Sequence, residues 1–221
     1  MLLKLLWKKL KGKIYPRINV IDNSSVSDLL KDRPEVAELL YGHDDLKQWL
    51  IEQFSGNATR FPIQWDTKEP EDSEWAEHCY PRQNETAKIR VSRSISGVDQ
   101  LSGVVYELFN IQNHYRYKQI QKKAFNGEFS KQEYHLRAYR LEYAAMKKCK
   151  LFLKNHPSVF ATACDSDELY CTIMSLGSFQ EFFANLDRTN HGKTYFEKVY
   201  EDRIAPYRRK FSDDGRPLQV W

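Results

Sequence analysis

The sequence predicts an α+β fold that is mostly helical, with a small β-sheet packed with three or four longer helices. Apolar residues recur at helical spacing through most of the chain after residue 96. Two short stretches, residues 60–66 and 87–92, have the composition of strands instead. We expect a basic amphipathic segment over residues 1–14 and a single α+β domain over residues 15–221. Within that domain we expect a helical N-terminal part (22–56), a small sheet (60–92) and a second helical part (96–205).

Length and composition limit the class of protein. A chain of 221 residues can bury a full core without disulfides or metals. Hydrophobic residues make up 41% and charged residues 29%, which excludes disordered and membrane-spanning compositions. No apolar run approaches the ~18 residues that a spanning helix needs. We therefore expect a cytoplasmic protein that has the option of associating with a membrane surface.

Positive charge is concentrated at the N-terminus. The net charge is +4, yet residues 1–21 hold six basic residues and no acidic one. The rest of the chain carries 28 basic and 30 acidic residues and is nearly neutral. A nucleic-acid partner is not predicted, because such domains carry a basic footprint.

The first thirteen residues have the pattern of a basic amphipathic helix. Four apolar residues share one side of the helix, and three lysines lie opposite them. The apolar residues are Leu3, Leu6, Trp7 and Leu10, and the lysines are Lys4, Lys8 and Lys11. Such a helix suits peripheral contact with an anionic membrane through residues 1–13, or docking on the domain itself or on a partner. A signal peptide is not expected, because lysines interrupt the apolar region.

Short elements are expected over residues 22–92. Pro34 suits the first turn of a helix, Gly42 ends that helix, and Asp44 or Asp45 begins another that runs to Phe54. Pro62 makes the first strand an edge or irregular strand. The acidic stretch between the two strands is expected to be a solvated connection.

Capping signals place the longer helices. A capping-box-like start at Ser96 opens a helix that we expect to reach Phe125, and a strong capping box at Ser130 opens one to about Asn155. A third helix is expected from residues 165–168 to about 186, broken or bent near 177–178. A fourth is expected over residues 193–204, and residues 218–221 could dock as a terminal strand.

The helix that begins near Ser96 has two contrasting sides. Leu101, Val105 and Leu108 define its core side. Five polar or aromatic residues share the other side: Tyr106, Glu107, Asn110, Asn113 and His114. These five either line a binding cleft, together with Glu142 from the following helix, or form a solvated helix face.

Residue types and spacing limit the chemistry. The six histidines are never four apart, and the four cysteines include no C-x-x-C pair, so the usual zinc and redox motifs are absent. Cys79, Cys149, Cys164 and Cys171 are interpreted as buried free thiols, with two disulfides as the alternative in an oxidising compartment. Since a buried carboxylate needs a partner, Glu142 is expected to pair with Arg90, Arg137 or Arg140.

Residues 88–150 resemble the helix pair of zincin metallopeptidases. The order is a strand, a helix containing Tyr106-Glu107-Leu108-Phe109-Asn110, and a second long helix containing Glu142. In that family an HExxH helix supplies two histidine ligands and the general-base glutamate, and in one branch a glutamate on a following helix supplies the third ligand. The resemblance implies that Glu107 is the catalytic-glutamate position and Glu142 the third-ligand position. Tyr106 and Asn110 stand where the family has histidines, so the resemblance implies that zinc hydrolysis is lost.

Three hypotheses about function are consistent with these patterns. The first is a non-catalytic, degenerate zincin-like domain that needs no cofactor and acts through contacts with an unknown protein partner. The second is a metal-dependent hydrolase that holds zinc with an unusual ligand set drawn from His78, Glu107, His114 and Glu142. The third is a membrane-surface accessory protein anchored by the basic N-terminal helix.

Overall fold

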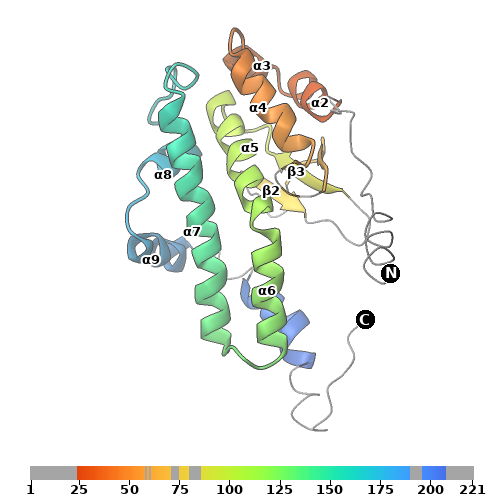
Figure 1. Ribbon diagram of the computed structural model, residues 1–221. Helices are drawn as coiled ribbons and strands as arrows, with labels where there is room; N and C mark the ends of the chain where they lie inside the picture. Colours follow the sequence, from red (N-terminus) through yellow and green to blue (C-terminus); the bar gives the residue numbers. More distant parts are fainter. Residues whose placement is uncertain are drawn as a thin grey trace, which may run out of the picture.

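The computed structural model has the predicted α+β architecture, mostly helical with a small sheet (Figure 1). It describes residues 24–57, 59, 61–70, 75–79, 86–189 and 196–207, without the side chains of residues 185–189. The predictions for residues 1–14 and 218–221 lie outside these ranges. Within the described residues, no helix combines the length and the apolarity that crossing a bilayer requires.

Three short helices precede the sheet: α2 (Ser24–Asp32), α3 (Pro34–Leu39) and α4 (Asp44–Phe54). Pro34 is the first residue of α3, as predicted, since proline has no N–H to leave unpaired there. Gly42 has a φ of 79° in the turn between α3 and α4, a conformation that side-chain-bearing residues rarely adopt. The expected boundaries at these positions are therefore confirmed.

The sheet has three strands in the order β1-β3-β2: β1 (Ile63–Trp65), β2 (Ala76–Cys79) and β3 (Ala87–Val91). β1 is parallel to β3, and β2 is antiparallel to it, with His78 opposite Ile89. The acidic stretch between the predicted strands 60–66 and 87–92 was expected to be a solvated connection. That prediction was wrong, because β2 forms within this stretch. Strand β2 is defined by hydrogen bonds to β3, which local composition does not encode.

The predicted helix from residue 97 to 125 is two helices, α5 (Gly97–Gln112) and α6 (His114–Phe125). Asn113 separates them: its N–H bonds to the Asn110 carbonyl, and its side chain donates to the Leu141 carbonyl at 3.1 Å. The apolar periodicity of the sequence continues past Asn113 and so predicts one helix. The contact of Asn113 with the neighbouring helix interrupts the helix at this point. The start was predicted correctly, because the Ser96 hydroxyl accepts the Asp99 N–H.

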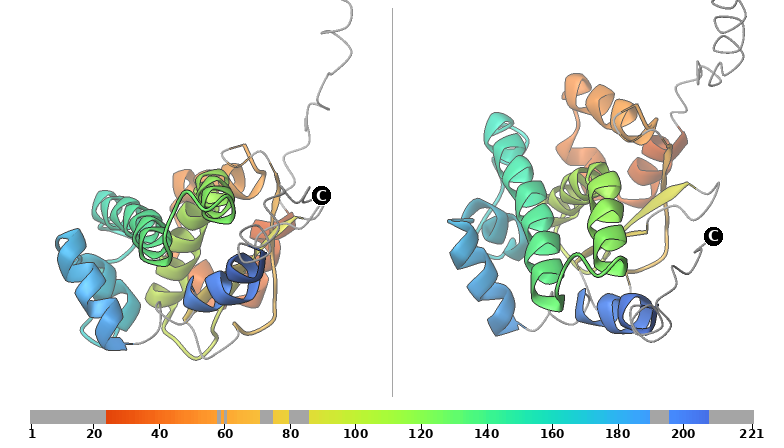
Figure 2. Two further views of the ribbon diagram at one scale, coloured as in Figure 1. Left: turned by 90° about the horizontal axis from the view of Figure 1, so that it is seen from below. Right: turned by 60° about the horizontal axis from the view of Figure 1, so that its bottom comes forward.

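Helix α7 (Lys131–Asn155) runs back along α5 and α6 (Figure 1). Its capping box forms as predicted, with Ser130 and Glu133 exchanging side-chain and backbone hydrogen bonds. The predicted break near residues 177–178 is also confirmed, since α8 (Glu168–Met174) and α9 (Phe179–Thr189) are separate helices. Figure 2 shows α8 and α9 on one side of α7. Residues 196–207, which include the π-helix η2 (Tyr200–Ile204), lie below α6 in the same figure.

Helix α5 lies between the sheet and α7 and is covered from several directions. It contacts β2, β3, α3, α7 and α8. Leu101, Val105 and Leu108 are fully buried, which confirms the predicted core side. At Gly103 an added Cβ would lie 3.0 Å from the Ala76 side chain, so α5 approaches β2 closely. The interpretation of the other side as a solvated face was wrong, because Glu107, Asn110, Asn113 and His114 are buried too.

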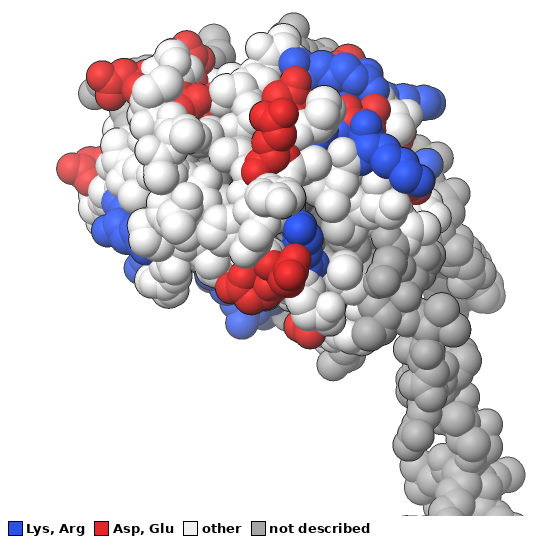
Figure 3. Space-filling view, turned by 90° about the horizontal axis from the view of Figure 1, so that it is seen from above, with Lys and Arg blue, Asp and Glu red and all other residues white. Residues whose placement is uncertain are grey.

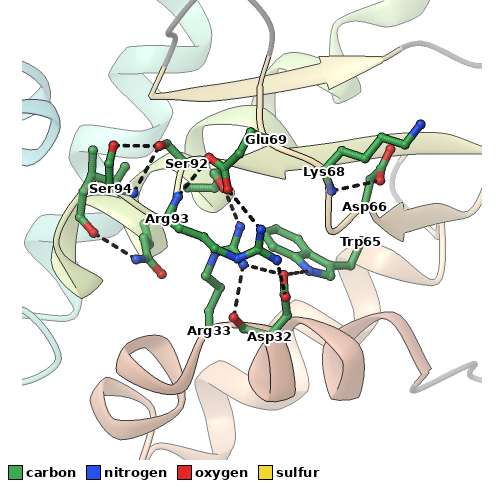
Figure 4. A network of polar contacts seen from close by, with 12 residues as sticks. Asp32, Arg33, Trp65, Asp66, Lys68, Glu69, Ser92, Arg93 and Ser94 are labelled. Atoms are coloured by element: carbon green, nitrogen blue, oxygen red, sulfur yellow. Dashed lines mark hydrogen bonds and ion pairs between the residues drawn. The ribbon is translucent and has the colours of Figure 1, made fainter.

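A buried arginine joins the N-terminal helices to the sheet (Figure 4). Arg33 is 1% exposed; it donates to the Val91 carbonyl at 2.6 Å, pairs with Asp32 and lies over the Trp65 ring. Asp32 also accepts hydrogen bonds from Trp65 at 2.9 Å and from Arg93 at 2.7 Å. The corner between α2 and α3 is thereby attached to β1 and to the end of β3.

Candidate functional site

Five polar side chains from three elements meet beside α5, and we call them the polar cluster. They are His78 on β2, Tyr106, Glu107 and Asn110 on α5, and Glu142 on α7. The Tyr106 hydroxyl donates to Glu142 Oε2 at 2.7 Å. His78 Nδ1 lies 2.5 Å from Glu107 Oε2, and the Asn110 amide donates to the same oxygen at 3.3 Å.

The positions of these side chains result from the packing of the elements. Helix periodicity places Tyr106 and Asn110, four residues apart, on one side of α5. The antiparallel α7 brings Glu142 opposite them, and Asn110 also hydrogen bonds with Glu142. Strand β2, packed closely on α5, brings His78 to Glu107. The two glutamates therefore converge from neighbouring helices instead of pointing to opposite sides of the molecule.

The cluster is largely shielded from water. Glu107 is 4% exposed as a residue, and the His78 side chain is 14% exposed. Burial lowers the pKa of His78, but the charge and hydrogen bond of Glu107 raise it more, with further contributions from Glu142 and Glu77. The pKa of His78 therefore lies above its ordinary value, which favours an imidazolium paired with the Glu107 carboxylate.

In the second pair, Tyr106 and Glu142, the pKa of each group is raised, which favours the protonated form. Burial raises the pKa of Tyr106 well above its usual range, and the charges of Glu142 and Glu107 act in the same direction. Burial also raises the pKa of Glu142, although His78 opposes that shift. Because a phenol with a raised pKa keeps its proton, Tyr106 is a hydrogen-bond donor to Glu142 over the whole neutral range.

Asn113 and His114 have contacts of their own. Asn113 bonds to the backbone of α7, and His114 makes an edge-on ring contact with Phe61 at 5.5 Å. Burial, together with Lys118 and His78, lowers the pKa of His114 to about 4. Of the predicted cleft residues, the structure joins Tyr106, Glu107, Asn110 and Glu142 in one hydrogen-bonded group and gives Asn113 and His114 separate partners.

The polar cluster does not fit the zinc site that the resemblance implies. The atoms of Tyr106 and Asn110 that replace imidazole nitrogens are a phenol and an amide, and both are hydrogen bonded to the glutamates. Zinc in proteins takes thiolate, imidazole or carboxylate donors. Within the described ranges, no group of three or more His, Cys, Asp or Glu residues is arranged to hold a metal ion. His114, the fourth residue of the predicted ligand set, faces Phe61.

The predicted arginine partners of Glu142 have other contacts. Arg90 bonds to Asp66 at 2.9 Å and to Glu77 at 3.3 Å. Arg137 lies over the Phe129 ring, and Arg140 lies over the Phe179 ring. The observed partner, Tyr106, is a neutral phenol 36 residues away on another helix, and a match of opposite charges cannot predict such a donor.

Comparison with known proteins found no matching family model, no matching curated protein and no matching solved structure. Any inference about function therefore rests on the contacts within the molecule, above all those of the polar cluster. His78 belongs to the predicted ligand set with Glu107, but its strand was not predicted. The alternation in Ala76-Glu77-His78-Cys79 is too short to reveal a strand without its partner.

Proposed function

We propose that the protein is a non-catalytic, degenerate zincin-like domain that acts through contacts with a protein partner. The observation that carries the proposal is the hydrogen bond between Tyr106 and Glu142. In the zincin comparison, these residues stand at a histidine-ligand position and at the third-ligand position. They contact each other directly, so the side chains that would surround an ion satisfy each other instead.

The convergence of Glu107 and Glu142 also supports the proposal. The zincin resemblance requires the carboxylates of Glu107 and Glu142 to lie near each other, and both side chains belong to the polar cluster. Burying a polar side chain destabilises the folded protein unless that side chain is fully hydrogen bonded. We propose that the cluster holds β2, α5 and α7 in a fixed arrangement and that the partner binds elsewhere, on the surface.

Exposed apolar side chains favour a protein partner. Tyr41, in the turn between α3 and α4, is 85% exposed, and Leu151, near the end of α7, is 60% exposed. The turn between α3 and α4 and the end of α7 both lie at the top of Figure 1. Seen from above, acidic and basic side chains surround a broad region of the surface that has no charged side chain (Figure 3). Contiguous exposed apolar surface is typical of protein contacts, and we propose that these two side chains belong to such a surface.

The decisive test is to restore the missing ligands. The variant carrying Tyr106→His and Asn110→His places two imidazoles on the α5 face opposite Glu142. We expect it to bind one zinc ion per chain in titration calorimetry and elemental analysis, and to melt at a higher temperature with zinc than with chelator. The wild-type chain is expected to show neither response.

Two matched variants make this test specific. Adding Glu142→Gln to the double variant should weaken zinc binding at least about tenfold, because the third ligand loses its charge. Placing a histidine at the exposed position 115 (Tyr115→His) should create no site. A double variant that keeps its wild-type circular dichroism spectrum and binds no zinc would contradict the zincin-like arrangement.

A metal-dependent hydrolase is a second candidate, favoured by one observation. His78 contacts Glu107, and the charge of Glu142 raises the pKa of His78, so three residues of the predicted ligand set lie in one cluster, although in the described residues they are not arranged to hold an ion. The test is the metal content of the wild-type protein together with peptide hydrolysis. Near-stoichiometric metal, and hydrolysis that disappears in Glu107→Gln, would favour this candidate over the proposed function.

A further inference from the structure

Two cysteines lie close together where the chain enters α8. Cys171 Sγ is 3.5 Å from the carbonyl oxygen of Cys164, and Cys164 Sγ is 3.0 Å from the Ser166 hydroxyl. Both thiols are free, Cys164 is exposed and Cys171 is half-buried. All four cysteines were predicted to be buried, and that prediction is correct only for Cys149, because Cys79 is half-buried as well.

The backbone between the two cysteines is already folded into a turn. The Asp167 N–H donates to the Cys164 carbonyl at 3.0 Å, and the Asp167 carboxylate accepts the Cys164 N–H at 2.6 Å. The Cys171 N–H donates to the Asp167 carbonyl at 2.8 Å. Side chains of a helix tilt toward its N-terminus, so Cys171 points back at this turn. A rotation about the Cα–Cβ bond of Cys164 moves its sulfur without moving the backbone.

We propose that Cys164 and Cys171 form a thiol–disulfide site that low-molecular-weight disulfides oxidise. This inference is independent of the zincin-like proposal, because neither cysteine belongs to the polar cluster. It rests on the contact of the Cys171 sulfur with the carbonyl oxygen of Cys164 and on the exposure of the Cys164 thiol.

The reaction is two successive thiol–disulfide exchanges. The Cys164 thiolate attacks one sulfur of the reagent, the reagent's S–S bond breaks, and one reagent thiolate leaves. The Cys171 thiolate then attacks Cys164 Sγ, which expels the second reagent thiolate and forms the intramolecular disulfide. The protein loses two electrons, the reagent gains them, and the two thiol protons end on the released thiols.

The environment of the two thiols determines which thiol reacts first and how the rate of disulfide formation depends on pH. Burial raises the pKa of Cys171, and the charges of Asp165, Asp167 and Asp99 raise it further. The exposed Cys164 is therefore the entry point, and Cys171 is the thiol that resolves the mixed disulfide. Because thiolates are the nucleophiles, we expect the closing step to accelerate as the pH rises above neutral.

The turn between the cysteines also holds the start of α5. The Asp167 carboxylate accepts a hydrogen bond from the Ser96 hydroxyl at 2.5 Å, and Asp99 of α5 accepts the Tyr170 N–H at 2.8 Å. A disulfide between residues 164 and 171 restricts this turn in the unfolded chain as well as in the folded one. We expect oxidation to raise the melting temperature by about 5–10 °C.

The test is to treat the full chain with oxidised glutathione at pH 8 and map its thiols by mass spectrometry. Digestion must cut between the cysteines, for example after Glu168, because no lysine or arginine lies between them. We expect a disulfide-linked pair of peptides containing Cys164 and Cys171, no retained glutathione there, and reversal by reductant. In Cys171→Ser we expect a lasting glutathione adduct on Cys164, since nothing resolves it.

The other two cysteines provide the internal control. Cys149 is fully buried and Cys79 is half-buried beside Glu77, so both should react more slowly than Cys164. Lasting adducts on Cys164 of the wild-type chain, or a crosslink that involves Cys79 or Cys149, would overturn the proposal. A fully crosslinked sample with an unchanged melting temperature would overturn the inference that the disulfide restrains the turn beside α5.

Discussion

Single side chains decide how the polar cluster differs from a zinc site. Tyr106 is a donor that keeps its proton, so it pairs with the Glu142 carboxylate without any ion. A histidine at the same position would present a nitrogen lone pair instead, which is what zinc binds. The distinction depends on hydrogen-bonding capacity and not on size or burial.

His114 makes the stability of the protein depend on pH. Its pKa is lowered from 6.5 to about 4 because it is buried, so the folded protein holds it neutral. Between these two values the unfolded chain binds a proton that the folded chain does not. The free energy of unfolding should therefore fall as the pH drops from 6.5 to 4, by up to ~3 kcal/mol from this group.

The variant His114→Gln tests this prediction. Urea denaturation of both proteins at several pH values in this window should give a shallower decline for the variant. Measurements at pH 7.5 separate the constant loss of packing against Phe61 from the pH-dependent part. His78 acts in the opposite sense: its pKa is raised, so its contribution is complete below its ordinary pKa and is lost as the pH rises through the folded value. Parallel curves for the two proteins would show that His114 is not the group responsible.

At the scale of elements, capping residues determine where α7 begins. The Ser130 hydroxyl accepts the Glu133 N–H at 3.2 Å, and the Glu133 carboxylate accepts the Ser130 N–H at 2.8 Å. Two backbone donors at the end of the helix are thereby satisfied by residues three apart in the sequence. Local signals of this kind explain why the starts of α5 and α7 were predicted correctly.

Removing the cap should destabilise the protein measurably. We expect Ser130→Ala to lower the free energy of unfolding by ~1 kcal/mol, because the Glu133 N–H loses its acceptor. Urea denaturation monitored by circular dichroism would measure the change. Glu133→Gln is the matched variant, because it retains an acceptor for the Ser130 N–H and should lose less. Equal losses in the two variants would mean that the hydroxyl is not the important half of the box.

Two elements were mispredicted for a related reason. The break at Asn113 depends on the Leu141 carbonyl, and β2 depends on its pairing with β3. Both partners come from other parts of the chain, 28 residues away in the case of Asn113. Periodicity within a window reports which side of an element is apolar, but not which neighbour will interrupt or complete it.

At the scale of the whole molecule, a buried arginine holds separate layers together. Arg33 joins the corner between α2 and α3 to β3 and to the Trp65 ring of β1 (Figure 4). Arg93 and Glu69 extend the network to the surface, with an Arg93–Glu69 distance of 3.2 Å. A buried guanidinium needs all of its partners, because unpaired charge in the interior is costly.

Replacing this arginine should loosen the attachment of the N-terminal helices. We expect Arg33→Met, which keeps most of the side-chain length, to lower the free energy of unfolding by ~3 kcal/mol. The exposed Arg116→Met is the matched control and should change stability by less than about 0.5 kcal/mol. Hydrogen exchange should show the largest loss of protection in α2 and α3. A loss no larger than that of the control would show that Arg33 does not hold these layers.

Local patterns in the sequence were sufficient to predict the fold class, the core side of α5 and the capped starts of the long helices, because these depend on residues within one or two turns of each other. The sequence also singled out Glu107 and Glu142. The packing of the elements was needed to establish that the polar side of α5 is buried, that His78 contacts Glu107 and that Tyr106 is the partner of Glu142. Those outcomes require three elements to pack together, and a side chain's partner is set by that packing and not by its neighbours in sequence.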